Sequence, residues 1–178
     1  MQNPIDSLLY VKISAEQAGK IFENLETSIP LPIQLSEPGQ KEDFKAENIK
    51  PEMILAGMLT VFAYDRENPH ISYYRKIFNL LRPDIRKEMT EAAIIKIKNN
   101  DFDMAEEILL SLEGLNPDDG ITKLNLALLM EERSQFCEMR ELFDDALSFN
   151  KRAEEIYSEI ILFEPPLPGV FLMLHIFL

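Results

Sequence analysis

The spacing of prolines constrains the fold of this chain more than any other feature of its sequence. The interval from Pro83 to Pro117 defines a period of about 34 residues, and Pro51 opens the segment before them. Stepping by this period brings small or apolar residues into register: Met58 with Ala92 and Leu126, Leu59 with Ala93 and Ala127, Ile71 with Ala105, and Phe78 with Leu112. A fixed period of this length is typical of proteins in which stacked helix pairs bury their apolar faces against each other.

Each period divides into two predicted helices. In the second period, apolar residues at helical spacing occupy 88–98 and again 102–115, and the polar residues 99–101 separate the two runs. A residue that precedes proline disfavours the helical conformation, so the second run ends ahead of Pro117. We therefore predict units at about 51–83, 84–117 and 118–165, followed by a truncated unit at 166–178.

The third unit is longer than the others, because the interval from Pro117 to Pro165 exceeds the period by two heptads. The pattern of 102–105 recurs at 143–146, and that of 105–108 recurs at 153–156, so seven residues are added before the second helix and seven within it. Seven residues are about two helical turns, so both helices should project about 10 Å beyond their neighbours. The extension carries Phe136, Met139, Leu142, Phe143, Leu147 and Phe149. These residues either pack the two long helices together or form a protruding contact surface for a partner.

Three stretches of this pattern resemble the tetratricopeptide repeat family: Ala92-Ala93, the run from Asp101 to Ile108, and Leu115-Asn116-Pro117. The resemblance covers about residues 51–178. It implies an all-α fold, a right-handed superhelical array of antiparallel helix pairs, in which small residues let the paired helices approach closely. Lys96 and Ile71 depart from the pattern of the family, and Ile71 makes the first unit a degenerate repeat.

The resemblance also implies a function and a place for it. Arrays of this family bind an extended or helical peptide along a concave groove, so we expect a scaffold for protein–protein interaction. The groove positions carried over from the family are Ala56, Thr60, Ala63 and Tyr64 in the first unit, Lys87, Thr90, Ile94, Ile97 and Lys98 in the second, and Ile121, Leu124, Leu128 and Glu131 in the third. The groove is either filled by the chain's own segment 29–33 or absent, because these rows simply pack adjacent helices.

The N-terminal 35 residues differ from the helical region in their pattern of apolar and polar residues. Residues 8–13 have the pattern of a strand, residues 14–25 that of a short helix, and 29–33 contain two prolines that favour extended backbone. Residues 36–50 are polar and rich in helix breakers, which predicts an exposed linker. We therefore expect a small N-terminal appendage, with some strand, ahead of the helical array.

Composition narrows the classes of function. The formal net charge of −13 argues against nucleic acid and anionic membranes as partners and favours a basic protein or peptide. One cysteine and two histidines argue against a disulfide framework and a structural zinc site. The sequence contains no phosphate-binding loop, dinucleotide-binding glycine pattern or nucleophile elbow, so we expect no enzyme activity, cofactor or metal. The first residues lack the pattern of a secretory signal, and we expect a cytoplasmic protein.

The apolar C-terminal residues suggest two further hypotheses. Phe171, Leu174 and Phe177 lie in a stretch that would form the first helix of a further unit, with no second helix to pair with it. Such an end is expected either in a fragment of a longer array or in a chain whose end is covered by another chain. The alternatives to the scaffold are therefore a subunit that self-associates through this end, and the regulatory repeat region of a longer protein.

Overall fold

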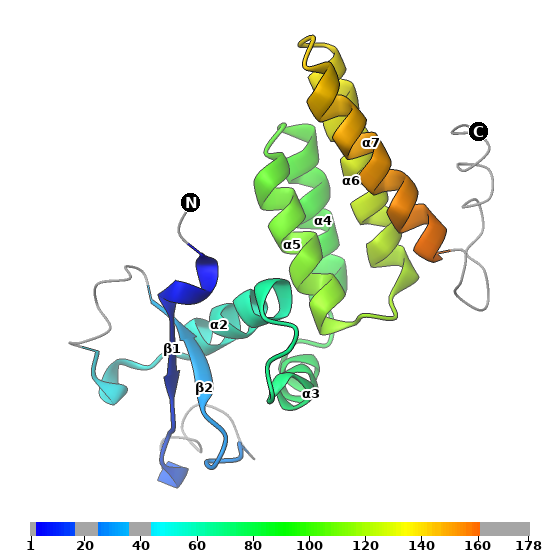
Figure 1. Cartoon of the computed structure of the whole chain (residues 1–178). Helices are drawn as coiled ribbons and strands as arrows, with labels where there is room; N and C mark the ends of the chain where they lie inside the picture. The colour runs from blue at the N-terminus through cyan, green and yellow to red at the C-terminus, as the bar shows by residue number, and fades with distance from the viewer. Residues whose placement is uncertain (1–2, 17–24, 36–43, 161–178) are drawn as a thin grey trace. The chain divides into compact units, whose positions relative to one another are not determined.

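The structure is a computed structural model, and it describes residues 3–16, 25–35 and 44–160 (Figure 1). The described chain is mostly helical, with a small two-stranded sheet near its N-terminus. It divides into two compact units, Met1–Ile85 and Arg86–Leu178, each of which has its own buried core. The predictions of a mainly helical chain from residue 51 onward and of a strand near the N-terminus are both confirmed.

The first unit combines the sheet with two helices. Strands β1 (Leu8–Val11) and β2 (Leu31–Gln34) pair antiparallel, with Leu9 opposite Ile33. Helices α2 (Pro51–Tyr64) and α3 (Ile71–Leu81) follow, and short 3₁₀ turns occupy Pro4–Ser7 and Ala46–Asn48. Most of the short helix predicted for 14–25 falls outside the described residues.

Strand β2 packs closely on helix α2 because of one glycine. A Cβ atom added to Gly57 would lie 2.6 Å from the carbonyl carbon of Pro32, a contact that neither backbone can relieve without shifting. Leu31 and Ile33 of the same strand are buried, with 1% and 0% of their surface exposed. The segment 29–33, which we expected to be extended, thus provides part of the core of the first unit.

Two tyrosines of α3 hydrogen-bond the residues that precede β2. The Tyr74 hydroxyl donates a hydrogen bond of 2.6 Å to the carbonyl oxygen of Pro30, and the Tyr73 hydroxyl accepts one of 2.8 Å from the Glu26 amide. Burial is the main cause of a raised pKa of the Tyr74 hydroxyl, so this group stays protonated and able to donate. The hydrogen bonds therefore tie residues 26–30 to the helical part of the unit.

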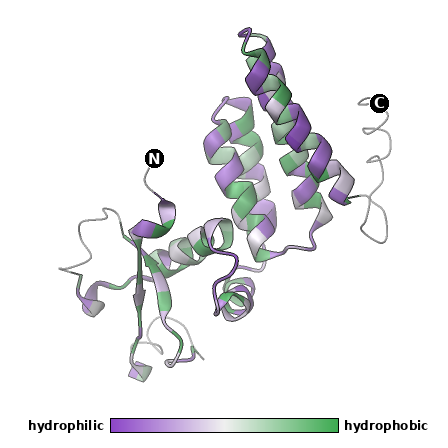
Figure 2. Ribbon diagram, viewed as in Figure 1, coloured by the Kyte–Doolittle hydropathy of each residue, from purple (hydrophilic) through white to green (hydrophobic). Residues whose placement is uncertain are grey.

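The second unit contains four helices within its described residues, which end at 160. They are α4 (Ile85–Lys98), α5 (Phe102–Leu115), α6 (Gly120–Glu138) and α7 (Phe143–Ile160). Hydrophobic and hydrophilic residues interleave along each of them in Figure 2, as expected for helices that bury one face. The shared core contains Ala93, Ala105, Leu109, Leu112, Leu126, Ala127, Leu129, Met130, Ala153, Tyr157 and Ile160.

The turns between α4 and α5 and between α6 and α7 have the same backbone structure. The Asp101 amide donates to the Lys96 carbonyl at 2.9 Å, and the Leu142 amide donates to the Cys137 carbonyl at the same distance. Asn100 and Glu141, one residue earlier in each turn, have φ angles of 57° and 61°. This is the arrangement of a Schellman motif, which satisfies carbonyl groups at the end of a helix.

Helices α6 and α7 are the longest in the described chain, at 19 and 18 residues against 14 in α4 and in α5. The extra length carries the α6–α7 turn beyond the α4–α5 turn (Figure 1). Elongation of this helix pair is what the two added heptads predict. The C-terminal unit expected at 166–178 lies outside the described residues.

Candidate functional site

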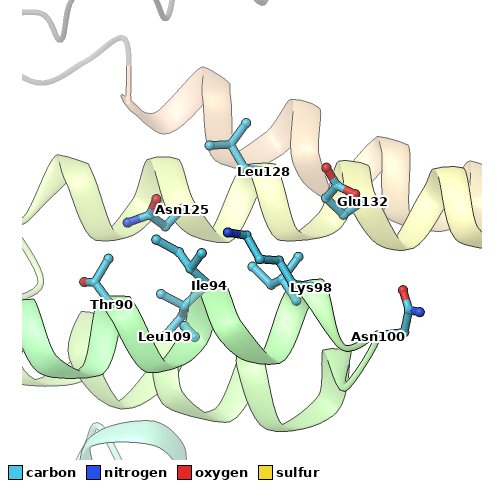
Figure 3. A pocket seen from close by; sticks show the side chains of 10 residues that line it. Thr90, Ile94, Lys98, Asn100, Leu109, Asn125, Leu128 and Glu132 are labelled. Atoms are coloured by element: carbon cyan, nitrogen blue, oxygen red, sulfur yellow. The ribbon is translucent and has the colours of Figure 1, made fainter.

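A pocket of about 450 Å³ opens on the second unit between α4 and α6 (Figure 3). Its volume falls within the range of roughly 300–1,000 Å³ that is typical of ligand pockets. It is lined by Thr90, Ala93, Ile94, Ile97, Lys98, Asn100, Leu109, Asn125, Leu128 and Glu132. All of these lining residues belong to the second unit.

Helical spacing on both helices places these side chains on the pocket. On α4, residues 90, 94 and 97 are three or four positions apart, and on α6 so are residues 125, 128 and 132. Ala93 and Leu109 are almost fully buried beneath them, with 1% and 0% exposed. The small side chain of Ala93 leaves room for the hollow, while the larger Leu109 of α5 fills the space behind it.

The polar side chains lie at the two ends of the pocket. Thr90 and Asn125 lie at one end, to the left in Figure 3, and Asn100 and Glu132 lie at the other. The side chain of Lys98 reaches over the opening between them. An apolar middle with polar groups at both ends can hold an apolar side chain of a ligand and hydrogen-bond the groups on either side of it.

Five of the predicted groove residues line this pocket. They are Thr90, Ile94, Ile97 and Lys98 of α4 and Leu128 of α6. Four of the five residues predicted on α4 thus lie together at this pocket. Ile94 is 42% exposed, which means that a large part of its side chain is open to a ligand.

The remaining predicted residues of the second unit do not line the pocket. Lys87 is exposed in the first turn of α4, and Ile121 is 46% exposed at the start of α6. Leu124 packs against the core, and Glu131 is half-buried and interacts electrostatically with the Tyr157 hydroxyl of α7. The α6 side chains that line the pocket beside Leu128 are Asn125 and Glu132, each next in sequence to a predicted residue.

The predicted groove residues of the first unit belong to a different compact unit. The Thr60 hydroxyl hydrogen-bonds Gln34 of β2 at 3.0 Å, and it also donates to the Ala56 carbonyl at 3.2 Å. Ala63 is buried and Tyr64 half-buried at the end of α2. The C-terminal candidates Phe171, Leu174 and Phe177 lie outside the described residues.

Sequence reasoning missed Ala93, Asn100, Leu109, Asn125 and Glu132 as pocket residues. Asn125 and Glu132 had a detectable signal, because they lie three positions before and four positions after Leu128. Asn100 could not be found by spacing, because it follows the end of α4 and reaches the pocket through its left-handed backbone. Leu109 comes from the neighbouring helix, which a pattern within one helix does not indicate.

The Glu131 carboxyl beside the pocket is in an unusual environment. Burial raises its pKa, the interaction with the Tyr157 hydroxyl opposes that rise, and the negative charge of Glu132 adds to it. The pKa of Tyr157 is raised as well, first by burial and then by the charge of Glu131. The ionisation of Glu131 on α6 and that of Tyr157 on α7 therefore influence each other.

A second, smaller hollow of about 230 Å³ shares Asn100 with the first pocket and lies beside Phe102, Phe136, Cys137 and Phe149. Arg133 of α6 joins three helices there. Its guanidinium binds Asp103 at 2.7 Å and Glu106 on α5, and its Cζ lies 4.6 Å from the ring centre of Phe149 on α7. Arg152 of α7 also binds Glu106, at 2.7 Å.

Two interpretations were given for the extension of the third unit: packing of the two long helices, and a contact surface for a partner. They apply to different residues. Phe136 and Phe149 are half-buried and pack inside the unit, with the Phe136 ring 5.2 Å from that of Phe102. Met139, Leu142, Phe143 and Leu147 are 77%, 48%, 66% and 70% exposed. The aromatic base of the extension thus packs the helices together, while its end presents apolar side chains to the outside.

Within the part of the chain that the structure describes, no group of three or more His, Cys, Asp or Glu side chains is arranged to hold a metal ion. None of the described helices combines the length and apolar character needed to cross a bilayer. Comparison of the chain with protein-family models, with curated proteins and with solved structures gives no match.

Proposed function

We propose that this chain is a protein-interaction scaffold of the tetratricopeptide type, and that it binds a partner peptide through the α4–α6 pocket. The proposal rests chiefly on one observation: Thr90, Ile94, Ile97, Lys98 and Leu128 were expected to form a groove and line one pocket. A peptide would insert an apolar side chain between Ile94 and Leu128. Its backbone would hydrogen-bond Asn125 at one end and Asn100 at the other.

The internal similarity of the two hairpins supports a repeat architecture. The α4–α5 and α6–α7 turns share their hydrogen bonds and their left-handed residue. Ala93 and Ala127, which are one period apart in the sequence, are both buried where helices approach each other. Stacked hairpins of this kind form extended surfaces suited to binding peptides, and they require no catalytic group.

The net charge favours a basic partner. A protein with a formal net charge of −13 attracts cationic chains, which raises the rate of encounter more than it adds to the affinity. Lys98 and Glu132 both line the pocket, so a bound peptide would meet one positive and one negative charge there.

Substitution of Ile94 tests the proposal, with its neighbour in sequence as the matched control. Peptides would be selected from a random displayed library on the full chain, and their affinities measured by fluorescence polarisation. We expect Ile94→Glu to weaken binding by at least about tenfold, equal to about 1.4 kcal/mol, because it places a charge in the apolar middle of the pocket.

The control is Ile95→Glu, because Ile95 is 58% exposed on the same helix and does not line the pocket. It should bind like the unsubstituted chain. Equal losses in the two variants, or peptides that bind Ile94→Glu at full strength, would contradict the proposed site.

A further inference from the structure

The end of the α6–α7 hairpin presents four large apolar side chains that the described part of its unit leaves exposed. We call Met139, Leu142, Phe143 and Leu147 the hairpin tip. Their exposed fractions range from 48% to 77%. An exposed cluster of apolar side chains on a folded protein usually marks an interaction surface, because contact with water is unfavourable for it.

The hairpin tip has a firm base. Beneath it the Phe136 ring contacts that of Phe102 edge to face, and the Arg140 guanidinium lies 4.2 Å from the Phe136 ring centre. Phe143 and Leu147 are four residues apart in α7 and therefore lie on the same face of that helix. The tip is thus held on two packed helices, and binding would not have to order it first.

Carboxylates surround the hairpin tip. Glu138, Glu141, Asp144 and Asp145 are exposed between and beside its apolar residues. Arg140 is the one cation between residues 138 and 147, and its side chain lies over an aromatic ring. The surface therefore combines apolar side chains with strong negative charge.

This combination selects one kind of occupant. A second copy of the chain would bring the same four carboxylates against these, which costs free energy through like-charge repulsion. The chain's own residues 161–178 contain no lysine or arginine to complement the charge. An amphipathic helix rich in Lys and Arg complements both features, with its apolar stripe on the tip and its cations on the surrounding carboxylates.

We infer that the hairpin tip is the docking surface for a basic amphipathic helix of a partner protein. Met139 suits this role, because the flexible side chain of methionine adapts to different apolar partners. The inference is independent of the α4–α6 pocket, because none of the four tip residues lines it.

A designed peptide tests the inference directly. The probe is a fluorescently labelled helix of about 18 residues, five turns, built from leucine at helical spacing and lysine elsewhere. A peptide of the same composition in scrambled order and a leucine–glutamate peptide of the same pattern serve as controls. Anisotropy titrations on the full chain should give at least about tenfold tighter binding of the lysine helix than of the scrambled peptide, and no binding of the glutamate helix.

Two variants locate the binding. Phe143→Gln/Leu147→Gln should weaken it by at least about tenfold. Leu80→Gln/Ile95→Gln, which removes two other apolar side chains exposed by 69% and 58%, should leave it unchanged. Glu138→Gln/Glu141→Asn removes two negative charges at the end of α6 and in the turn, with an asparagine that suits the left-handed backbone at position 141, and it should weaken binding more at low salt than at high salt.

The outcomes separate this inference from the proposed function. Ile94→Glu should bind the lysine helix with full affinity, even if the pocket proposal fails. Equal affinity for the scrambled peptide, or full binding by Phe143→Gln/Leu147→Gln, would overturn the inference. So would dimerisation of the chain that disappears in Phe143→Gln/Leu147→Gln, because the occupant would then be a second copy. If Phe143→Gln/Leu147→Gln does not fold, the salt dependence of binding by Glu138→Gln/Glu141→Asn decides whether the inference holds.

Discussion

Two single residues set the geometry of the hairpin turns. Asn100 and Glu141 both adopt left-handed backbone, with φ angles of 57° and 61°. Left-handed backbone brings the Cβ of any residue except glycine close to the following carbonyl oxygen. The short polar side chain of asparagine offsets this cost by local hydrogen bonding, whereas glutamate has no such advantage. The α6–α7 turn is therefore under more strain than the α4–α5 turn, at a residue beside the hairpin tip.

Replacing Glu141 by glycine should relieve this strain. We expect Glu141→Gly to raise the free energy of unfolding by about 1 kcal/mol, because glycine adopts left-handed backbone without a steric penalty. Glu138→Gly, at the last residue of α6, is the matched control and should lower stability by roughly 0.5–1 kcal/mol. Urea denaturation of the three proteins measures the difference. A destabilised Glu141→Gly would show that the carboxylate contributes more than the strain costs.

At the scale of the elements, local patterns predicted the helices well and their facing surfaces less well. Helix α5 was predicted at its observed bounds, Phe102–Leu115, because a polar turn precedes it and a proline follows it. On α6 the pocket is lined by Asn125 and Glu132 beside the predicted Leu128, because Leu124 and Leu128 fit either of two neighbouring faces. Packing against both α5 and α7 decides which face of α6 turns inward, and a pattern within α6 alone does not contain it.

Contacts between distant segments were beyond the reach of sequence patterns. A strand was predicted at 8–13 from its own residues and is observed over Leu8–Val11, but its partner Leu31–Gln34 lies far along the sequence and leaves no signal in this segment. The close contact between Gly57 and Pro32 joins two separate elements of the chain and leaves no periodic signal. The same reason explains why Leu109 was missed at the pocket: it reaches that site from a second helix.

The Glu131–Tyr157 pair between α6 and α7 should make stability depend on pH. Burial raises the pKa of Glu131 above its ordinary value of 4.5, so the folded state holds this proton more tightly than the unfolded state. The pair's contribution to stability is therefore present below pH 4.5 and lost as the pH rises through the raised folded pKa.

Glu131→Gln should remove this dependence. At neutral pH the variant should unfold at higher urea concentration than the unsubstituted chain, and the difference should shrink below about pH 4. Glu154→Gln on the exposed face of α7 controls for the loss of one negative charge. Parallel stability profiles of Glu131→Gln and the unsubstituted chain between acid and neutral pH would argue against a buried carboxylate at this position.

For the whole molecule, the important feature is that its two compact units have separate cores. The first is built around β2 and α2, with Ile33, Met58 and Phe62 fully buried. The second is built from α4 to α7 and contains both proposed binding surfaces. Damage to the core of the first unit should therefore not spread through the packing of the second.

Gly57→Val tests this separation. The valine side chain would collide with the backbone of Pro32, and we expect the first unit to lose about 3 kcal/mol or more of stability. Hydrogen–deuterium exchange followed by mass spectrometry should show faster exchange over α2 and α3. Exchange over α5, α6 and α7 should stay within about twofold of the unsubstituted chain, because local unfolding follows cooperative units.

Ala56→Val, on the same helix at a half-buried position, is the matched control and should have a much smaller effect. If Gly57→Val accelerates exchange in both units alike, the chain unfolds as one cooperative body, and the binding surfaces of the second unit depend on the first.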